Sequence, residues 1–354
     1  QDLLFGGTAK TTNANINFAG GNEYTSFRLG GSYFTQGTIY PGDYNYKKVT
    51  GDINVNHRSS DNKLTLNFSA NYGVDLNNLV GFNGLLSSTT LFLPPNAPPV
   101  FNEDGSLHWE EWGEAGLDNP LAGYFNHSST ATNNLLTNLN ISYQIAGGLQ
   151  ARLNTGYTYF NSQELLKRPE KSYNPSDAVQ NNSFHLRSNR KSWILEPQLV
   201  YNESFGRLNL ETIIGGTFQS NTGNNLSLQG QGYVAEALIG NLDAAEAVLN
   251  ASSQTTEYNY AAAFARVGTN WKKKYFVNLT GRRDGSSRFG PGKRFSSFGA
   301  LGTAWIFSEE AFVKNSLPFL SFGKLRGSYG TTGNDQIGDY GYFEAYEATQ
   351  IGRA

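Results

Sequence analysis

The sequence predicts an all-β fold, specifically an antiparallel transmembrane β-barrel. Three features favour this class: apolar and polar residues alternate with period two, tight turns alternate with long connections, and glycine and aromatic residues are abundant. The chain has 354 residues, with 40 glycines, 20 tyrosines and 23 phenylalanines but only 38% hydrophobic residues. This content is too low for several thick cores, yet it suffices for one apolar face on each strand.

Alternation is clearest in residues 64–74, where Leu64, Leu66 and Phe68 alternate with polar residues. The same pattern recurs at 149–159 and 208–218. Each of these segments is long enough to cross a bilayer as a tilted strand, which takes about 9–11 residues. Further strands are expected at 13–20, 24–36, 47–58, 134–146, 191–204, 256–271, 275–284, 296–307 and 323–331. We therefore expect about a dozen strands in a single domain spanning residues 1–354.

The connections between these strands alternate in length. Tight turns are expected at 20–23, 59–62, 146–148, 205–207 and 272–274, and longer excursions at 37–46, 76–133, 163–190, 222–255 and 285–295. A barrel inserted from the periplasm has this asymmetry, with short periplasmic turns and long external loops. The helix-like patch 235–249 falls in a connection. The connection 308–322 is longer than the turn due at its place, and the sequence offers no reason for its length.

Composition excludes several classes of function. Cysteine is absent, which removes disulfides and thiolate chemistry, and no apolar run reaches the length of about 18 residues that a transmembrane helix needs. The net charge is −2, and Lys272–Lys274 is the densest basic run, so we expect no nucleic-acid partner. The four histidines are scattered without metal-ligand spacing. We expect no metal, no cofactor and no enzymatic activity.

Aromatic residues gather near the expected strand ends. They either form the girdles found where a barrel meets the headgroups, or pack across neighbouring strands. The residues concerned are Tyr33, Phe34, Tyr40, Trp271, Tyr275, Phe276, Trp305 and Phe307.

Alternation also places polar side chains on the inner side of the barrel. Asn67, Asn71, Glu211 and Arg282 are the candidates for lumen-facing residues, where they either contact cargo or a plug, or only solvate the interior. The long segment 94–124 contains Trp109 and Trp112 beside paired prolines, including Pro94. These tryptophans either stack on sugars and grip a partner protein, or staple the loop to the barrel rim.

Several strings resemble the SusC/RagA family of TonB-dependent outer-membrane transporters. The strings are Asn278–Gly290 (NLTGRRDGSSRFG), Ala304–Phe312 (AWIFSEEAF), Lys324–Asn334 (KLRGSYGTTGN), Ile337–Tyr340, Gln1–Asp2, Gly20–Glu23, Gly30–Phe34 and Asn119–Ala122. The first string contains the family-motif loop, Arg283, Asp284, Gly285, Ser286, Ser287, Arg288 and Phe289. By this resemblance, the loop and the segment 285–295 are external and the turn 20–23 is periplasmic.

The resemblance implies a fold and a function. Large plugged transporters typically have 22 strands, so the dozen expected here would be part of a barrel whose plug, TonB box and closing strands lie outside this chain. It implies uptake of an oligosaccharide or peptide across the outer membrane of a Gram-negative bacterium of the Bacteroidota, powered by TonB–ExbB–ExbD. It also implies a SusD-like surface lipoprotein as lid and outer-membrane lipid as surroundings.

Two other readings remain open at this point. A passive porin or a surface adhesin would share the strand pattern. A soluble all-β carbohydrate-binding protein, such as a propeller or sandwich, would show internal repeats of about 40–50 residues, which are not evident in the sequence.

Overall fold

The computed structural model describes residues 6–40, 42–79, 93, 95–339 and 341–342. Gln1, Asp2, Pro94 and Tyr340, which belong to motifs named above, lie outside the described residues. Among the described residues, no helix is both long and apolar enough to span a membrane.

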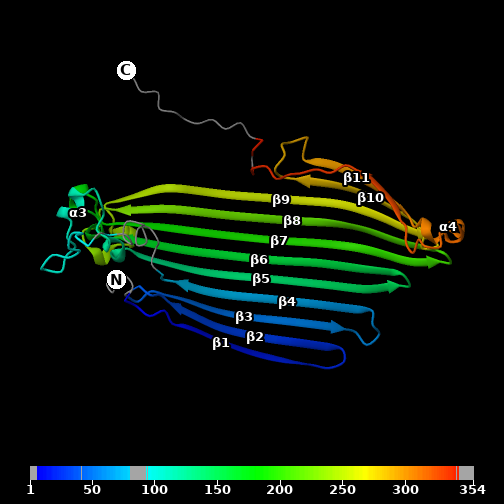
Figure 1. Cartoon of the computed structure of the whole chain (residues 1–354), viewed down its shortest axis with the longest axis horizontal. Helices are drawn as coiled ribbons and strands as arrows, with labels where there is room; N and C mark the ends of the chain where they lie inside the picture. The colour runs from blue at the N-terminus through cyan, green and yellow to red at the C-terminus, as the bar shows by residue number, and fades with distance from the viewer. Residues whose placement is uncertain (1–5, 41, 80–92, 94, 340, 343–354) are drawn as a thin grey trace, which may run out of the picture.

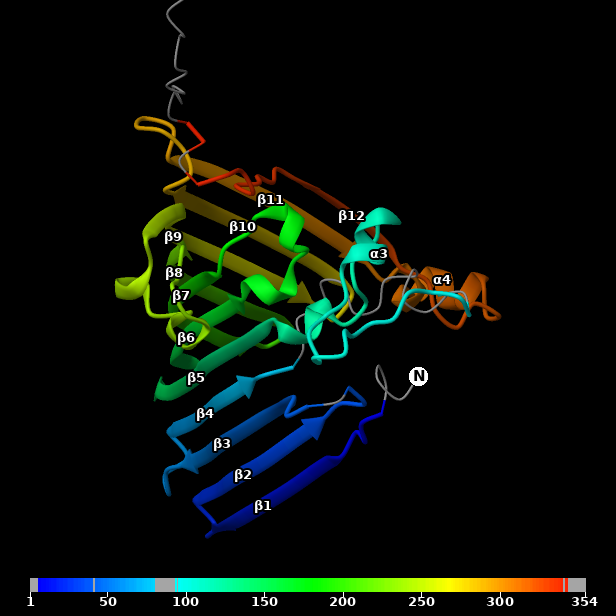
Figure 2. The same ribbon diagram turned by 90° about the vertical axis from the view of Figure 1, so that its left-hand side faces the viewer.

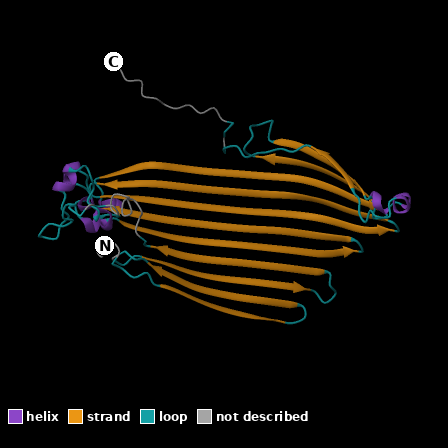
Figure 3. Cartoon of the chain, in the orientation of Figure 1, coloured by secondary structure: helices purple, strands orange, loops and turns teal. Residues whose placement is uncertain are grey.

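The described chain forms a 12-stranded sheet in which every strand pairs with its neighbours in sequence. All pairs are antiparallel, and the few short helices lie at the two ends of the strands (Figures 1 and 3). The strands are β1 (Thr11–Gly21), β2 (Thr25–Gly37), β3 (Asn45–Arg58), β4 (Leu64–Asn77), β5 (His127–Ala146), β6 (Leu149–Arg168), β7 (Asn182–Phe205), β8 (Leu208–Gln231), β9 (Ala247–Trp271), β10 (Tyr275–Ser286), β11 (Phe295–Trp305) and β12 (Leu325–Gly330). The predicted strand number and all-β class are confirmed.

The connections sort by length between the two ends of the sheet. The tight turns lie at one end, called the turn end, and the long connections except the one between β11 and β12 lie at the other, called the loop end (Figure 1). Turn chemistry fits these sites: Lys272 and Lys273 have φ of 54° and 55°, as the two central residues of a type I′ turn require, and Gly206 has φ of 62°. The predicted alternation is therefore confirmed.

Strands β6 to β9 continue past their predicted ends at the loop end. β7 begins at Asn182 rather than at 191, β8 runs to Gln231 rather than to 218, and β9 begins at Ala247 rather than at 256. Apolar alternation breaks off in these extensions because 187–192, 219–225 and 252–257 carry no large apolar side chain, so the pattern used for the prediction ends before the strand does. The patch 235–249 contains two short 3-10 helices, η4 (Glu236–Leu238) and η5 (Leu242–Ala244), followed by the start of β9.

The sheet curves into an open arc, seen along the strands in Figure 2. One face carries the apolar alternation, with Ile16, Phe18, Ile214 and Leu279 all exposed. This apolar face is convex, because the β8–β9 connection projects from the convex side and its Gly240 lies against Leu165 on the same face. The opposite, concave face is polar. The sheet therefore has the two contrasting surfaces of a barrel wall.

Aromatic rings at the turn end stack across strands. Trp271, Tyr275 and Trp305 lie on the convex face with ring centroids 5.7 and 6.4 Å apart. Phe34 instead packs against Tyr46 at 6.0 Å on the concave face, so it does not belong to a girdle facing outward. Cross-strand packing is thus present at both places, and the Trp271 group and the exposed Tyr33 lie on the convex face as an interfacial girdle would.

The long connection between β11 and β12 is a folded cap. It contains η6 (Phe307–Glu309) and α4 (Ala311–Ser316) at the turn end. The Glu310 carboxylate accepts hydrogen bonds from the Tyr275 hydroxyl at 2.7 Å, from Trp305 Nε1 at 3.3 Å and from Lys274 Nζ at 3.3 Å. The bond from Tyr275, then those from Trp305 and Lys274, hold the pKa of Glu310 below its usual range. The extra length thus fastens the cap to the aromatic stack.

Candidate functional site: the concave face and the loop end

Strand register places the predicted inner residues on one face. Asn67 pairs with Asn56 and Asn140, Asn71 lies four residues along the same face of β4, and the pairing carries this face through to Glu211 on β8 and Arg282 on β10. All four residues therefore lie on the concave face. Their contact with cargo, with a plug or only with water stays a proposal.

Arg282 is held in a fixed position on this face. Its Nε donates to Asp284 Oδ1 at 2.6 Å, and its Nη2 donates to the Tyr260 hydroxyl at 2.5 Å. The guanidinium also lies 5.5 Å from the centre of the Phe264 ring. These contacts fix the plane of the guanidinium, so its remaining donors point in a set direction.

Glu211 borders a hollow near the turn end of the concave face. The hollow measures about 520 Å³ and is also lined by Arg266 and Asn278. Arg266 donates to Asn278 Oδ1 at 3.2 Å. A carboxylate, a guanidinium and an amide on adjacent strands can bind polar groups of either charge.

Nearer the loop end of the concave face, hydroxyl and amide side chains form hydrogen bonds between neighbouring strands. Ser188 donates to Asn225 at 2.7 Å, and Ser192 donates to Asn221. Both pairs join β7 to β8. Such groups offer donors and acceptors without net charge, which matches the hydroxyls of sugars and the amides of peptides.

At the loop end of β9, β10 and β11, Arg288 of the family-motif loop contacts Tyr258, Asp335 and Asp339. These contacts are called the lock. Arg288 Nε donates to Asp339 at 2.8 Å, its Nη1 donates to the Asp335 carbonyl at 3.1 Å, and its guanidinium lies 4.4 Å from the Tyr258 ring. The Tyr258 hydroxyl donates to the Asp335 carboxylate at 2.7 Å. Burial, and then the bond to Asp335, raise the pKa of Tyr258, so the phenol stays protonated. The segment 331–339 is thereby tied over the tip of the hairpin.

Other residues of the same loop are structural too. Ser287 exchanges hydrogen bonds with the Asn259 backbone at 2.9 Å, and Ser286 is buried. Arg283 lies 5.7 Å from the Phe295 ring on the convex face, and a Cβ on Gly285 would meet the same ring at 2.5 Å. Sequence analysis located this loop but did not identify its partners Tyr258, Asp335 and Asp339, which are distant in sequence.

The two tryptophans of the long β4–β5 connection have different surroundings. Trp112, in α3 (Glu110–Glu114), is only 1% exposed and its Nε1 donates to the Pro99 carbonyl at 2.9 Å. Its position favours the stapling role left open by the sequence, because a buried ring cannot contact a ligand in this conformation. Trp109 is partly exposed, packs against the small core of Leu107, Leu121 and Ala122, and stays a candidate contact.

Asn119 holds this loop together, a role that its place in the Asn119–Ala122 string does not indicate. It is 2% exposed, and its amide donates to the Val100 and His108 carbonyls, each at 2.8 Å. The chain then passes through η1 (Ala122–Phe125), where the Tyr44 hydroxyl donates to the Tyr124 carbonyl at 3.2 Å. Burial, and then the neighbouring Tyr40 and Tyr44, raise the pKa of Tyr124 to about 12.

A groove separates this loop from the β6–β7 connection, which contains η2 (Glu170–Ser172) and η3 (Pro175–Asp177). It measures about 680 Å³ and is lined by Trp109, His108, Lys171 and Tyr173 among others. Lys171 bonds Glu236 at 2.8 Å, and its ammonium lies 4.8 Å from the ring of Phe125. A half-exposed indole beside a phenol and fixed charges suits a sugar or peptide chain.

Comparisons with known proteins find relatives of one kind. No family model matches the chain. The chain is 29% identical over 349 residues to "TonB-dependent receptor P26" of Formosa agariphila, covering 96% of this chain and 34% of the relative. It is 23% identical over 372 residues to "TonB-dependent receptor SusC" of Bacteroides thetaiotaomicron, covering 98% of this chain and 36% of the relative. The chain thus spans about a third of the length of these curated relatives.

Solved structures agree on the fold. The "closed-closed" state of the RagAB peptide importer superposes with a TM-score of 0.73 at 21% identity, covering 99% of this chain and 40% of that one. The chain matches a barrel portion of the TonB-dependent receptors of SusC/RagA type. The resemblance read from the motifs is therefore confirmed, and so are the outer-membrane location and the link to Bacteroidota. The matched proteins are receptors and transporters, a class that is not enzymatic.

Proposed function

We propose that the chain forms part of the wall of a TonB-dependent importer that carries an oligosaccharide or a peptide across the outer membrane. The observation that carries the proposal is the contrast between the faces, with an apolar convex surface and a concave surface of amides, hydroxyls and fixed charges that includes Asn67, Asn71, Glu211 and Arg282. On a strand wall of SusC/RagA type, this polar surface suits a hydrated passage.

The same proposal gives roles to the two ends of the sheet. The loop end faces outward, so the Trp109 groove and the family-motif loop meet cargo or a lid protein there. A SusD-like surface lipoprotein is the proposed lid, supported by the description of one structural relative as the two-component RagAB peptide transporter. TonB–ExbB–ExbD is the proposed energy source, supported by the names of the sequence relatives.

Growth on defined nutrients tests the cargo class. Strains with the full-length gene intact, deleted or restored would be compared on a panel of glycans and peptides as sole nutrients. We expect a defect on one class of substrate, reproduced when TonB is disabled. A deletion that leaves growth unchanged on every substrate while lowering passive permeability or surface attachment would favour a porin or an adhesin instead.

A further inference from the structure

The apolar band on the convex face ends well below the loop end of the strands. On β8 the band runs from Leu208 to Phe218, which spans about 25 Å of membrane for a strand tilted by about 40°. β7 and β8 then continue to Asn182 and Gln231. The convex surface of these extensions therefore lies at and above the level of the lipid headgroups, given the outward orientation proposed above.

A column of cations follows this surface. Lys191 and Arg187 lie on β7 beyond Trp193, and Lys167 lies on β6 opposite Ser183. The strand rise places Lys191 about 5 Å, Arg187 about 15 Å and Lys167 about 25 Å above the band. Amide side chains, including Asn161 opposite Asn189, lie between them.

Among the residues that the structure describes, Lys167, Arg187 and Lys191 form no ion pair, and Lys191 has only a ring contact of 6.0 Å with Tyr159. Burial, then Arg187 and Lys167, lower the pKa of His185, which stands between the two and stays neutral at pH 7. Lys191 and Arg187 are exposed.

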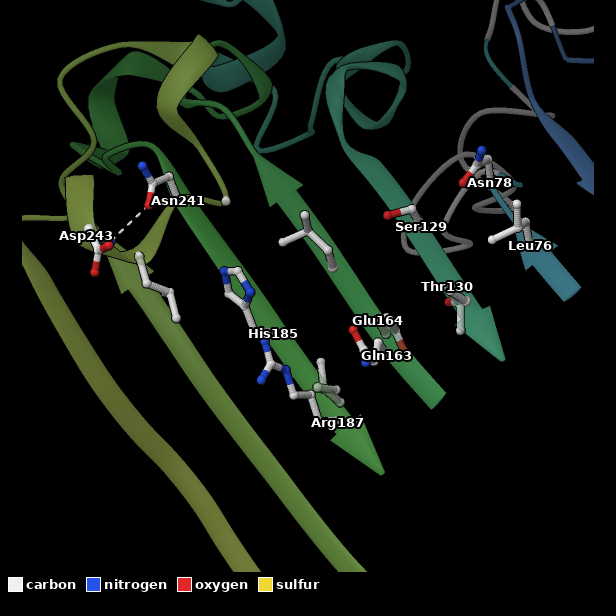
Figure 4. Close-up of a pocket in the computed structure, with 15 residues that line it drawn as sticks. Leu76, Asn78, Ser129, Thr130, Gln163, Glu164, His185, Arg187, Asn241 and Asp243 are labelled. Atoms are coloured by element: carbon white, nitrogen blue, oxygen red, sulfur yellow. Dashed lines mark hydrogen bonds between the residues drawn. The ribbon is translucent and has the colours of Figure 1, made fainter. Parts of the chain in front are cut away.

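A cavity of about 490 Å³ opens beside Arg187, where the β8–β9 connection folds over the convex face (Figure 4). Its lining offers amides from Asn78, Gln163 and Asn241 above apolar contacts from Leu76 and Leu165. Two acidic groups, Asp243 and Glu257, also border this surface. Amide groups and a cation around a partly apolar floor match a sugar that carries an anionic substituent.

We propose that this convex surface, formed by Lys167, Arg187, Lys191 and the Asn241 cavity, binds the headgroup of a phosphorylated glycolipid of the outer leaflet. The height of the column selects the occupant. A phospholipid presents its anionic group only near the edge of the band, at the level of Lys191, whereas Arg187 and the cavity lie at the level of sugars attached above it. Arg187 and Lys191 are about 13 Å apart along the strand, so one anionic group cannot contact both, and the ligand must carry a separate anionic group for each.

Lipid binding by the complete receptor in detergent tests this site, with rough lipopolysaccharide bearing a phosphorylated inner core, bisphosphoryl lipid A and phosphatidylglycerol as probes. Lys191→Ala should weaken binding of the lipopolysaccharide and of lipid A about fivefold, which corresponds to about 1 kcal/mol for one cation. Arg187→Ala should weaken only the lipopolysaccharide, by a similar factor. Arg190→Ala is the matched control, because this exposed cation lies on the concave face of the same strand.

The outcomes separate the alternatives. Equal loss with Arg190→Ala, or no loss with Arg187→Ala and Lys191→Ala, would overturn the site. Equal competition by phosphatidylglycerol, or by the free core oligosaccharide without lipid, would overturn the choice of glycolipid. Loss with Lys272→Ala and Lys273→Ala instead would show that the turn end faces outward. Binding needs neither cargo nor TonB, so failure of the proposed transport function would leave these results unchanged.

Discussion

Replacing Trp112 should unfold the β4–β5 loop without disturbing the barrel. The ring is 1% exposed and donates to the Pro99 carbonyl at 2.9 Å. Removing a buried tryptophan to alanine costs about 3–5 kcal/mol. If this loss of free energy falls on local opening of the loop, amide exchange across residues 99–125 should be faster by roughly two to three and a half orders of magnitude. Trp112→Phe keeps most of the packing but leaves the carbonyl without its donor, which costs about 1–3 kcal/mol.

Hydrogen exchange measured by mass spectrometry on the complete receptor checks this prediction, with β6 and β8 as internal references. Trp109→Ala is the control, because its partly exposed ring should be removable with little effect on exchange while cargo or partner affinity falls. Unchanged exchange in Trp112→Ala would refute the stapling role. An equal increase in exchange with Trp109→Ala would refute the assignment of loop packing to Trp112 and of ligand contact to Trp109.

Further predictions concern the cap, the lock and the convex face. The pKa of Glu310 is lowered in the folded protein, so the Glu310 carboxylate stabilises the cap at pH values above its unfolded pKa. This stabilisation is lost as the pH falls through the folded-state pKa. Trp305 fluorescence should follow that acid transition, and Glu310→Gln should abolish the transition. Arg288→Ala should speed amide exchange in residues 331–339 about tenfold, since charge-assisted bonds of about 1.5–3 kcal/mol are lost at a partly exposed site, and Arg288→Lys should rescue it only in part. Ile214→Arg should destabilise the barrel in lipid by about 2–4 kcal/mol, whereas Ile213→Arg on the concave face should cost far less in the same urea titration.

Sequence patterns predicted the parts of this fold that are governed by the membrane. Alternation gave the strand number and placed Asn67 and Arg282 on the same face across six strand pairs, because register carries one polar face through the whole sheet. It failed at the start of β7, where residues 187–192 are all polar and interrupt the apolar alternation. The reach of the strands beyond the lipid was therefore missed.

Features set by tertiary contacts were also beyond the sequence. Trp112 and Trp109 lie three residues apart in the same segment, and the sequence does not distinguish them. The fold of the loop buries Trp112 and leaves Trp109 beside a groove. The lock on Arg288 depends on Asp339, which lies far along the chain in a segment without strand or helix. The length of the β11–β12 connection is explained by Glu310, whose three partners come from β10, β11 and the turn before β10.

Energised uptake tests the central claim most directly. Cells expressing the full-length gene would be given a labelled oligosaccharide or peptide of the class found by growth, and its accumulation would be measured with TonB present and absent. The account predicts accumulation above the external concentration that is lost without TonB, and that is lowered when Glu211 and Arg282 are replaced on the concave face. Entry that only equilibrates with the medium and is indifferent to TonB would contradict the account.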